Sequence, residues 1–429
     1  MSSPTEMEHL YQIGMRFAAW LVMAMWRSRA FRKYLLVSNP KIYKFILGQW
    51  NLLTQIHEKS KGNQQSTYWF HAASYGEYNV IRPIIQEIRK KNIRVVVTFF
   101  SSSGFEALIK KNQKSNEVDD VFYLPWDTKK NASLFLDEVK PQKAIFAISE
   151  YWINYLNELG RRNIPTYFVS MYVGKKSYLL KWYGRTIRKA LHNVHTFMVL
   201  DEESKNNLGK IGFDNVIVTG DPLFDNAISL SHKPYHNKII ERFCNGSHDI
   251  FVAGSTSDKK DLALVSALAN TNPDVKFIVA PHEISEESLH EIIYHMKGKT
   301  LLCSECDTNT DFRDTQILAI DFFGSLSQIY SYGRWAYVGG GFTPHLHSVI
   351  EPVVYGIPVA FGPKIRRKKT AKRLVETGIG HIVRNPRDIK AWFMEMSAPE
   401  KLARVSERSR QYINCHSSVS ANITKIILS

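Results

Sequence analysis

Cysteine is scarce in this chain, and two common nucleotide-binding signatures are missing. Four cysteines among 429 residues are too few for a disulfide scaffold, so the composition is typical of a reducing, cytoplasmic setting. The pair Cys303 and Cys306 lacks a second pair of ligands at zinc-finger spacing, which favours two incidental thiols at a strand end over a metal or redox site. There is no Walker A loop, and no G-x-G-x-x-G follows the first predicted strand. These absences argue against a P-loop enzyme and a dinucleotide-dependent oxidoreductase.

Acidic residues are also in deficit, with 40 against 56 basic residues and a formal net charge of +16. Such an excess implies an anionic partner: a nucleic acid, an acidic membrane surface or a phosphorylated substrate. A basic but otherwise unremarkable surface is the plainer alternative. Nucleic-acid binding is disfavoured because aromatic and basic residues do not interleave and no finger or helix-turn-helix spacing occurs. The length and the 44% hydrophobic content indicate a globular protein of two or three domains.

The amino terminus lacks an apolar run long enough to be read at once as a membrane span. Residues 10–26 are apolar apart from Arg16, whereas a spanning helix needs about 20 apolar residues. Four basic residues follow: Arg27, Arg29, Arg32 and Lys33. A buried helix of a soluble domain is one interpretation. We favour a membrane-attachment helix, with Trp20 and Trp26 at the interface, the basic cluster on anionic lipid and the rest of the chain in the cytoplasm.

From residue 68 onward, apolar strands alternate with amphipathic helices. Strands are predicted at 68–73, 93–100, 144–148, 166–170 and 196–200, and in the second half at 249–253, 275–280, 316–320, 335–338 and 358–361. This alternation indicates parallel βαβ units and an α/β fold. We expect two Rossmann-like halves facing a cleft, with a hinge near 219–222 and ligands beyond the carboxyl ends of the strands.

Two strand-to-helix loops could carry chemistry. Glu77 opens a helix after the first strand, where it could be a favourable first-turn acid or a general base for an acceptor hydroxyl. The run Gly339–Gly341 follows a later strand and precedes Glu351. It could bring backbone N–H groups to a phosphate, with Glu351 on ribose hydroxyls, or it could be a tight turn beside a helix-capping acid. Weaker candidates at similar edges are Gly254, Ser255, Thr256, Pro281 and His282.

Metal binding is not expected. His345 and His347 form an H-x-H pair without a nearby carboxylate, which makes a poor metal site. His345 could instead contact a phosphate or a carboxylate of a bound substrate. We therefore predict a reaction that needs neither a metal ion nor an organic cofactor.

Several of these segments resemble the Kdo transferases, glycosyltransferase family 30. The similar stretches are HAASYGE from His71, SEYWIN from Ser149, VAGSTSD from Val252, and the long run from Asp321 to Pro363. The resemblance covers most of the chain from His71 onward. It implies a GT-B fold and inverting, metal-free transfer of 3-deoxy-D-manno-octulosonate (Kdo) from CMP-Kdo onto a tetraacylated lipid A precursor. A GT-B transferase using another nucleotide sugar and lipid acceptor is the alternative.

The resemblance also implies site residues. Glu77 matches the catalytic base, Glu150 a second acidic position and Lys181 a basic stabilising residue. The implied CMP-Kdo contacts are Gly254, Ser255, Thr256, Pro281, His282, Phe323, Gly324, Ser325, Gly340, Gly341, Ser348, Val349, Ile350 and Glu351. The expected organisation is a membrane-attachment segment over 1–37, an acceptor-binding domain over 38–218 and a nucleotide-sugar domain over 219–429. The expected location is the cytoplasmic face of the inner membrane. The number of Kdo units transferred does not follow from the sequence.

Overall fold

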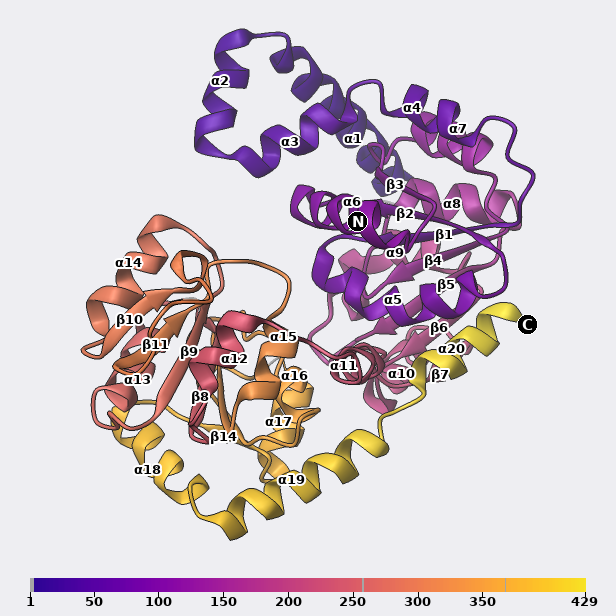
Figure 1. Ribbon diagram of the computed structural model, residues 1–429. Helices are drawn as coiled ribbons and strands as arrows, with labels where there is room; N and C mark the ends of the chain where they lie inside the picture. Colours follow the sequence, from indigo (N-terminus) through magenta and orange to yellow (C-terminus); the bar gives the residue numbers. More distant parts are fainter. Residues whose placement is uncertain (1–3, 257, 367) are drawn as a thin grey trace. The chain divides into compact units, whose positions relative to one another are not determined.

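The computed structural model describes residues 4–256, 258–366 and 368–429. The chain divides into two compact units (Figure 1). Unit 1 comprises the described residues up to Asn226 together with Ser418–Ser429, and unit 2 comprises Ala227–Ser417. Each unit is built around its own seven-stranded parallel sheet, so the predicted α/β fold with two Rossmann-like halves is confirmed.

The sheet of unit 1 has the strand order β3-β2-β1-β4-β5-β6-β7. Its strands are β1 (Thr67–Ala72), β2 (Arg94–Phe99), β3 (Asp120–Tyr123), β4 (Lys143–Ala147), β5 (Thr166–Met171), β6 (Thr196–Val199) and β7 (Val216–Val218). Its helices are α1 (Pro4–Trp26), α2 (Arg29–Ser38), α3 (Pro40–Gln49), α4 (Leu52–Ser60), α5 (Tyr75–Arg89), α6 (Ser102–Ser115), α7 (Lys129–Val139), α8 (Ile153–Arg161), α9 (Arg185–Leu191), α10 (Glu202–Gly209) and α20 (Val419–Leu428), and α11 (Leu223–Ser231) runs across the boundary to unit 2.

Both faces of this sheet are covered, which explains why its strands are apolar throughout rather than alternating. In β1, Trp69 joins the core on one face, while Tyr68 and Phe70 join the core on the other. The carboxyl-terminal helix α20 contributes Ile423 and Ile427 to the second core, the same core that α5 enters. The last residues of the chain therefore belong to the fold of unit 1.

The first strand of unit 1 lies between β2 and β4, so the direction of winding reverses between β1 and β4. In open α/β sheets ligands bind beyond the carboxyl ends of the strands at such a reversal. The loops that follow β1 and β4 carry Glu77 and Glu150, two of the predicted site residues. The topology therefore brings these two loops to one edge of the sheet.

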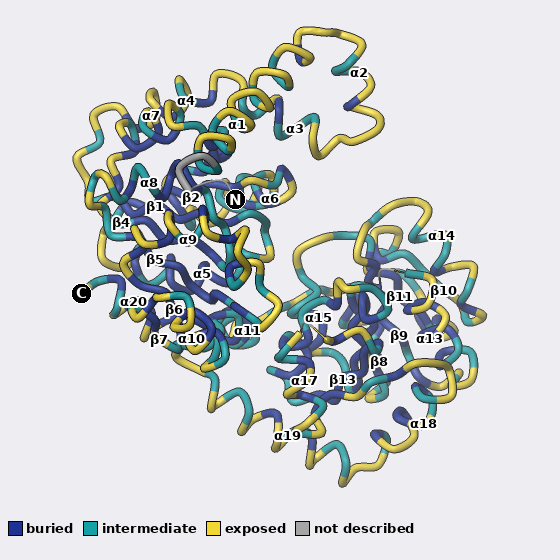
Figure 2. The backbone as a smooth tube through the Cα atoms, turned by 180° about the vertical axis from the view of Figure 1, so that it is seen from behind, coloured by how far each residue is buried: buried dark blue, intermediate teal, exposed yellow. Residues whose placement is uncertain are grey.

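The amino-terminal helices present many apolar side chains to solvent. Figure 2 shows α1, α2 and α3 mostly as exposed tube, and Leu10, Ile13, Phe17, Trp20, Tyr34, Leu36, Val37, Ile42, Leu47 and Trp50 are exposed. Trp26 is instead buried, packing against Tyr43 in a small cluster with Leu35 and Ile46, so its expected place at a lipid interface is wrong. No helix in the part of the chain that the structure describes combines the length and the apolarity needed to cross a membrane.

Helix α1 is also tied to the rest of unit 1. The Tyr11 hydroxyl donates to the Asp127 carboxylate over 2.5 Å, and that carboxylate also accepts the backbone N–H groups of Asn154 and Tyr155 at the start of α8. Residues 1–37 were expected to form a separate attachment segment. The contacts place the described part of that segment within unit 1.

The sheet of unit 2 repeats the winding pattern, with the order β10-β11-β9-β8-β12-β13-β14. Its strands are β8 (Ile250–Thr256), β9 (Lys276–Pro281), β10 (Lys299–Leu302), β11 (Thr315–Ala319), β12 (Trp335–Val338), β13 (Val359–Phe361) and β14 (Gly380–Ile382). Its helices are α12 (Lys238–Cys244), α13 (Lys259–Ala269), α14 (Glu286–His295), α15 (Leu326–Ile329), α16 (Ile350–Val353), α17 (Lys369–Glu376), α18 (Pro386–Met396) and α19 (Pro399–Asn414). The reversal lies between β8 and β12.

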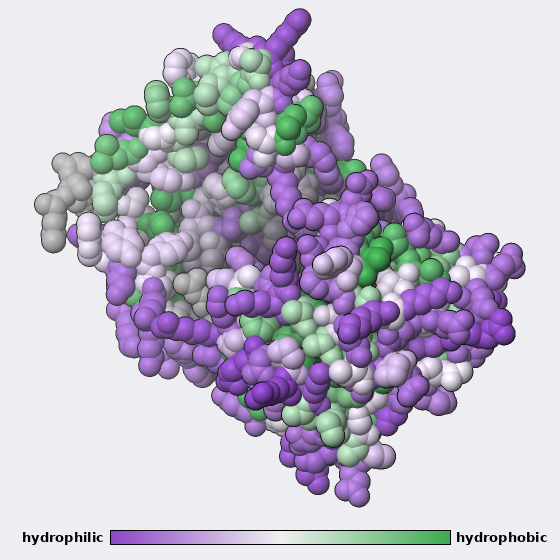
Figure 3. Space-filling model, turned by 90° about the vertical axis from the view of Figure 1, so that its left-hand side faces the viewer, coloured by the Kyte–Doolittle hydropathy of each residue, from purple (hydrophilic) through white to green (hydrophobic). Residues whose placement is uncertain are grey.

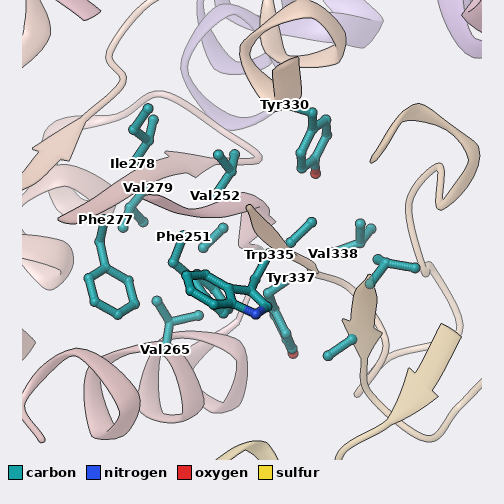
Figure 4. Packing of buried hydrophobic residues seen from close by; sticks show 14 of the residues in the cluster. Phe251, Val252, Val265, Phe277, Ile278, Val279, Tyr330, Trp335, Tyr337 and Val338 are labelled. Atoms are coloured by element: carbon teal, nitrogen blue, oxygen red, sulfur yellow. The ribbon is translucent and has the colours of Figure 1, made fainter. Parts of the chain in front are cut away.

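One continuous hydrophobic core holds unit 2 together. Figure 4 shows aromatic rings from neighbouring strands, among them Phe251, Phe277 and Trp335, with Val265 of α13 beside them. The Trp335 indole N–H donates to the carbonyl of Met396 at the end of α18. The central strands are thereby fixed, and the loops at their carboxyl ends start from rigid positions.

The division of the chain differs from the expected boundaries at two points. The boundary falls between Asn226 and Ala227 rather than after residue 218, and Ser418–Ser429 return to unit 1 instead of closing the second domain. The Asp225 carboxylate accepts the backbone N–H groups of Ser418 and Ser420, so it fixes the start of α20. Residues 219–225 therefore belong to unit 1.

Candidate active site

Glu77 lies at the start of α5, where local sequence dictates the geometry. Ser74 caps the helix, its hydroxyl accepting the Glu77 N–H over 3.4 Å. The Glu77 carboxylate in turn accepts the N–H of Ala73 over 2.7 Å. Side chains at a helix start commonly satisfy the free N–H groups of the first turn and of the residues beside it. The capping fixes the carboxylate at the end of β1.

The surroundings of Glu77 suit acid–base chemistry. Burial, and secondarily the nearby charge of Glu150, raise the pKa of Glu77 to about 7, while the N–H of Ala73 opposes the rise. A carboxyl group that titrates near neutral pH can accept a proton and release it again at physiological pH. Carboxylates shifted by burial and by a like charge are concentrated at functional sites.

Glu150 follows β4 and contacts two aromatic residues, the buried His71 and the half-buried Trp152. Its side chain is 19% exposed, and its Oε2 accepts the indole N–H of Trp152 over 3.1 Å and lies 3.5 Å from Nε2 of His71. The preceding Ile148 has φ +60°. A β-branched residue rarely adopts this left-handed conformation, and such strain is often kept at functional sites. The backbone before Glu150 is thus held in an unusual turn.

Lys181, the third predicted catalytic residue, is exposed and lies between two short 3₁₀ turns. Its backbone carbonyl accepts a hydrogen bond from Arg188. Within the described residues, neither Glu77 nor Glu150 has a hydrogen bond or ion pair with Lys181. Its assignment as a stabilising cation stays a prediction.

Unit 2 contains a cavity of about 480 Å³ beside the carboxyl ends of its central strands. Of the predicted donor contacts, Thr256, Pro281 and His282 line it. The other lining residues are Asp258, Lys259, Leu262, Glu283, Ser285, Glu287, Ser288, Glu291, Ile292, Thr343, His345 and His347. From the sequence, the His345/His347 pair is a poor metal site, and His345 alone is a possible contact for a phosphate or carboxylate; the structure places both histidines on the cavity wall.

The rings of two of these histidines lie against each other, tilted by 35°. The rings of His282 and His347 are 4.1 Å apart, centroid to centroid. Burial, followed by the neighbouring charges of His282, Lys368 and His345, lowers the pKa of His347 to about 4. His347 is therefore neutral at physiological pH and can accept a hydrogen bond through one ring nitrogen.

The glycine run after β12 allows three loops to pass close together. The N–H of Gly339 donates to the Gly254 carbonyl, and the N–H of Gly340 donates to the buried Asp261 carboxylate. A Cβ atom on Gly341 would lie 2.4 Å from the backbone nitrogen of Gly362. Close backbone approach is sufficient reason for these glycines. Contact of Gly340 or Gly341 with a phosphate stays a prediction.

The remaining predicted donor residues lie outside that cavity. Phe323 is 73% exposed, Gly324 has φ +103°, and Ser325 precedes α15. Ser348 and Val349 precede α16, which begins with Ile350 and Glu351. There, burial raises the pKa of Glu351 to about 7. The hydroxyl of Ser348 is buried without a hydrogen-bond partner among the described residues. Contact of these residues with CMP-Kdo stays a prediction.

Sequence reasoning missed two residues of the unit 1 site, His71 and Trp152. Both stand within the segments that carried the resemblance, but only the fold reveals that they meet. No group of three or more His, Cys, Asp or Glu side chains is arranged to hold a metal ion in residues 4–256, 258–366 and 368–429. The expected metal-free reaction stays a prediction.

Comparison with known proteins points to one family. Residues 51–226 match the family described as "3-Deoxy-D-manno-octulosonic-acid transferase (kdotransferase)". The 3-deoxy-D-manno-octulosonic acid transferase of Aquifex aeolicus is 25% identical over 368 residues, which cover 84% of this chain and 94% of that protein. A bifunctional glycosyltransferase/methyltransferase of Fusobacterium nucleatum is 26% identical over 327 residues. That match covers 74% of this chain but only half of the longer Fusobacterium protein.

Among solved structures, the UDP-GlcNAc 2-epimerase of Neisseria meningitidis bound to UDP-GlcNAc has a TM-score of 0.59 at 16% identity, covering 84% of this chain and 98% of that chain. A likeness at this identity supports the fold alone, a GT-B-like arrangement of two Rossmann-like units. The family match spans the segment that contains Glu77 and Glu150, and the Aquifex protein matches over most of both units. Over most of its length this chain is therefore similar to the Kdo transferases, a family of glycosyltransferases.

Proposed function

We propose that this protein transfers Kdo from CMP-Kdo onto a lipid A precursor at the cytoplasmic face of the inner membrane. The observation that carries the proposal is Glu77, a capped carboxyl group with a pKa of about 7 at the winding reversal of unit 1. The likeness to the Kdo transferases supports the donor, and the excess of basic residues suits an acceptor that bears phosphates.

In the proposed reaction, Glu77 removes the proton from the attacking acceptor hydroxyl. The hydroxyl oxygen forms a bond to the anomeric carbon of Kdo, the bond from that carbon to the CMP phosphate oxygen breaks, and CMP leaves with the electron pair. Attack opposite to the leaving group inverts the anomeric configuration. We assign the acceptor and the base to unit 1, and CMP-Kdo to unit 2.

The direct test is mass spectrometry of the lipid after incubation with CMP-Kdo and the tetraacylated precursor. We expect a product heavier than the acceptor by one or more Kdo residues. Parallel incubations with CMP-sialic acid and UDP-GlcNAc serve as controls. Transfer from either control donor but not from CMP-Kdo would refute the proposed donor.

We further propose that the exposed apolar side chains of α1–α3 rest on the membrane. On α1, Leu10, Ile13, Phe17, Trp20 and Leu21 are exposed and recur at helical spacing, which places them on one stripe. Apolar side chains gather in the upper part of Figure 3, where Figure 1 places these helices. Arg27, Arg29 and Lys33 are exposed beside them, and each basic residue near an anionic leaflet adds about 1 kcal/mol of attraction.

The membrane proposal predicts that the double variant F17Q/W20Q loses affinity for anionic vesicles. Each of these side chains is more than half exposed, so the substitutions should not unfold unit 1. Burying one large apolar side chain is worth about 1.5–3 kcal/mol. The affinity for vesicles, measured by flotation, should therefore fall at least about tenfold. Point variants are preferable to truncation, because removal of α1 would uncover the buried Asp127 that Tyr11 contacts.

The matched control is Y294Q/M394Q, which removes two exposed apolar side chains from unit 2. It should float like the unmodified protein. If F17Q/W20Q floats as well as this control, membrane attachment through α1 is wrong.

A further inference from the structure

His71 is completely buried at the end of β1, yet both of its ring nitrogens are within hydrogen-bond distance of other side chains. Nδ1 lies 2.8 Å from the hydroxyl oxygen of Thr98 on β2, and Nε2 lies 2.9 Å from the indole nitrogen of Trp152, which precedes α8. The imidazole therefore connects the first strand to the loop after β4, the loop that carries Glu150.

The partners of His71 determine where its proton lies. An indole nitrogen can only donate, so Nε2 of His71 must accept and Nδ1 must carry the hydrogen. Nδ1–H donates to the Thr98 hydroxyl oxygen, which also accepts the indole N–H of Trp69 over 2.8 Å. The opposite tautomer, or an imidazolium, would point an N–H at the Trp152 N–H. Among the three protonation forms of the ring, the neutral Nδ1–H form alone gives every one of these N–H donors an acceptor.

The Trp152 N–H is shared between two acceptors. It lies 2.9 Å from Nε2 of His71 and 3.1 Å from Oε2 of Glu150. The orientation of the indole ring that satisfies His71 is thus also the one that holds the Glu150 carboxylate. Asp127 accepts the N–H groups at the start of α8. The backbone beside Trp152 is therefore held without any contribution from His71.

We propose that His71 is a positioning residue for transfer: its unprotonated Nε2 fixes the Trp152 indole, and the indole N–H fixes the carboxylate of Glu150. The inference rests on the proposed function only for its effect on turnover. His71 does not exchange protons with substrate, because its side chain has no exposed surface and both ring nitrogens are engaged.

Two substitutions separate the parts of this connection. Glutamine carries its amide at about the reach of the imidazole Nε2, so H71Q keeps an acceptor for Trp152 and loses the donor to Thr98. Asparagine carries its amide at about the reach of Nδ1, so H71N keeps the donor and loses the acceptor. Both variants shrink the buried ring, which makes each the packing control of the other.

The first measurement needs no substrate. Histidine ¹⁵N spectra of the full chain should show His71 as the neutral Nδ1–H tautomer. The indole N–H resonance of Trp152 should shift in H71N and stay close to its original position in H71Q. An Nε2–H tautomer, or an imidazolium paired with Glu150 at pH 7, would overturn the proposal.

The second measurement is steady-state transfer from CMP-Kdo. We expect kcat to fall by about tenfold to a hundredfold in H71N, as for a mispositioned active-site group, and by only about threefold in H71Q, with KM for CMP-Kdo unchanged in both. Equal losses in the two variants would reduce His71 to a packing residue. If the unmodified protein transfers nothing from CMP-Kdo, the proposed function fails. The tautomer and indole spectra still test whether His71 fixes the Trp152 indole.

Discussion

Replacing Glu77 with glutamine should reduce transfer by about a hundredfold or more, the usual contribution of general-base catalysis, while folding and CMP binding persist. Glutamine retains an oxygen that can accept the Ala73 N–H, as the carboxylate does over 2.7 Å, but it cannot accept a proton. E77A should lose as much activity, and in addition the hydrogen bond to Ala73. Turnover close to normal in E77Q would exclude Glu77 as the base.

The pH dependence follows from the same group. The pKa of Glu77 is raised from 4.5 to about 7, and the base acts only when ionised, so kcat/KM should rise with pH and level off above about pH 7. E77Q should lack this rise. A profile for the unmodified protein that is flat between pH 5 and 8 would contradict the assignment.

The stability of the folded protein should fall as the pH rises, whereas its activity should increase. Because the pKa of Glu77 is higher in the folded than in the unfolded chain, its contribution to stability is fully present below about pH 4.5 and is lost as the pH rises through about 7. Glutamine never ionises, so E77Q should become more stable than the unmodified protein above pH 7, by about 1 kcal/mol or more. Thermal unfolding of both proteins at pH 4.5 and pH 8 measures this difference directly.

The strands that sequence reasoning found are those that the fold buries on both faces. Every predicted strand corresponds to an inner strand of one sheet, within a residue or two for most. The four missed strands, β3, β7, β10 and β14, are the four edges of the two sheets. They are three or four residues long and partly exposed. An edge strand needs apolar residues on fewer sides, so no long apolar run marks it.

The site could be predicted residue by residue but not as a connected set. Glu77 stands out because Ser74 and Glu77 have the spacing of a helix start. The meeting of His71 with Trp152 depends on β1 pairing with β4, although β2 and β3 intervene in the chain. Nothing local in the sequence reveals that these two strands lie on the far side of β1. The same limit applies to Asp261, whose contact with Gly340 depends on the pairing of β8 with β12.

The glycine run of unit 2 leads to the second large effect, which is on folding. Replacing Gly339 with alanine should destabilise unit 2 by about 3 kcal/mol or more, at the upper end for overpacking. The new Cβ would lie 2.1 Å from the Ser255 carbonyl oxygen and 2.8 Å from Cα of Thr256. Both are backbone atoms, so no side-chain rotation relieves the clash.

Relief would require β12 to separate from β8 at the point where Val338 pairs with Gly254. Ser255 cannot easily yield, because it already holds a strained φ of +54°. Since Thr256 and His282 line the cavity that follows these strands, any G339A protein that folds should also bind CMP at least about tenfold more weakly, as binding groups displaced by an ångström commonly do. The control is G209A at the end of α10, where an added Cβ meets no atom within 4 Å. Denaturant unfolding and calorimetric titration with CMP compare the two variants. If G339A has the same free energy of unfolding and the same CMP affinity as G209A, the close approach of these loops does not constrain the cavity of unit 2.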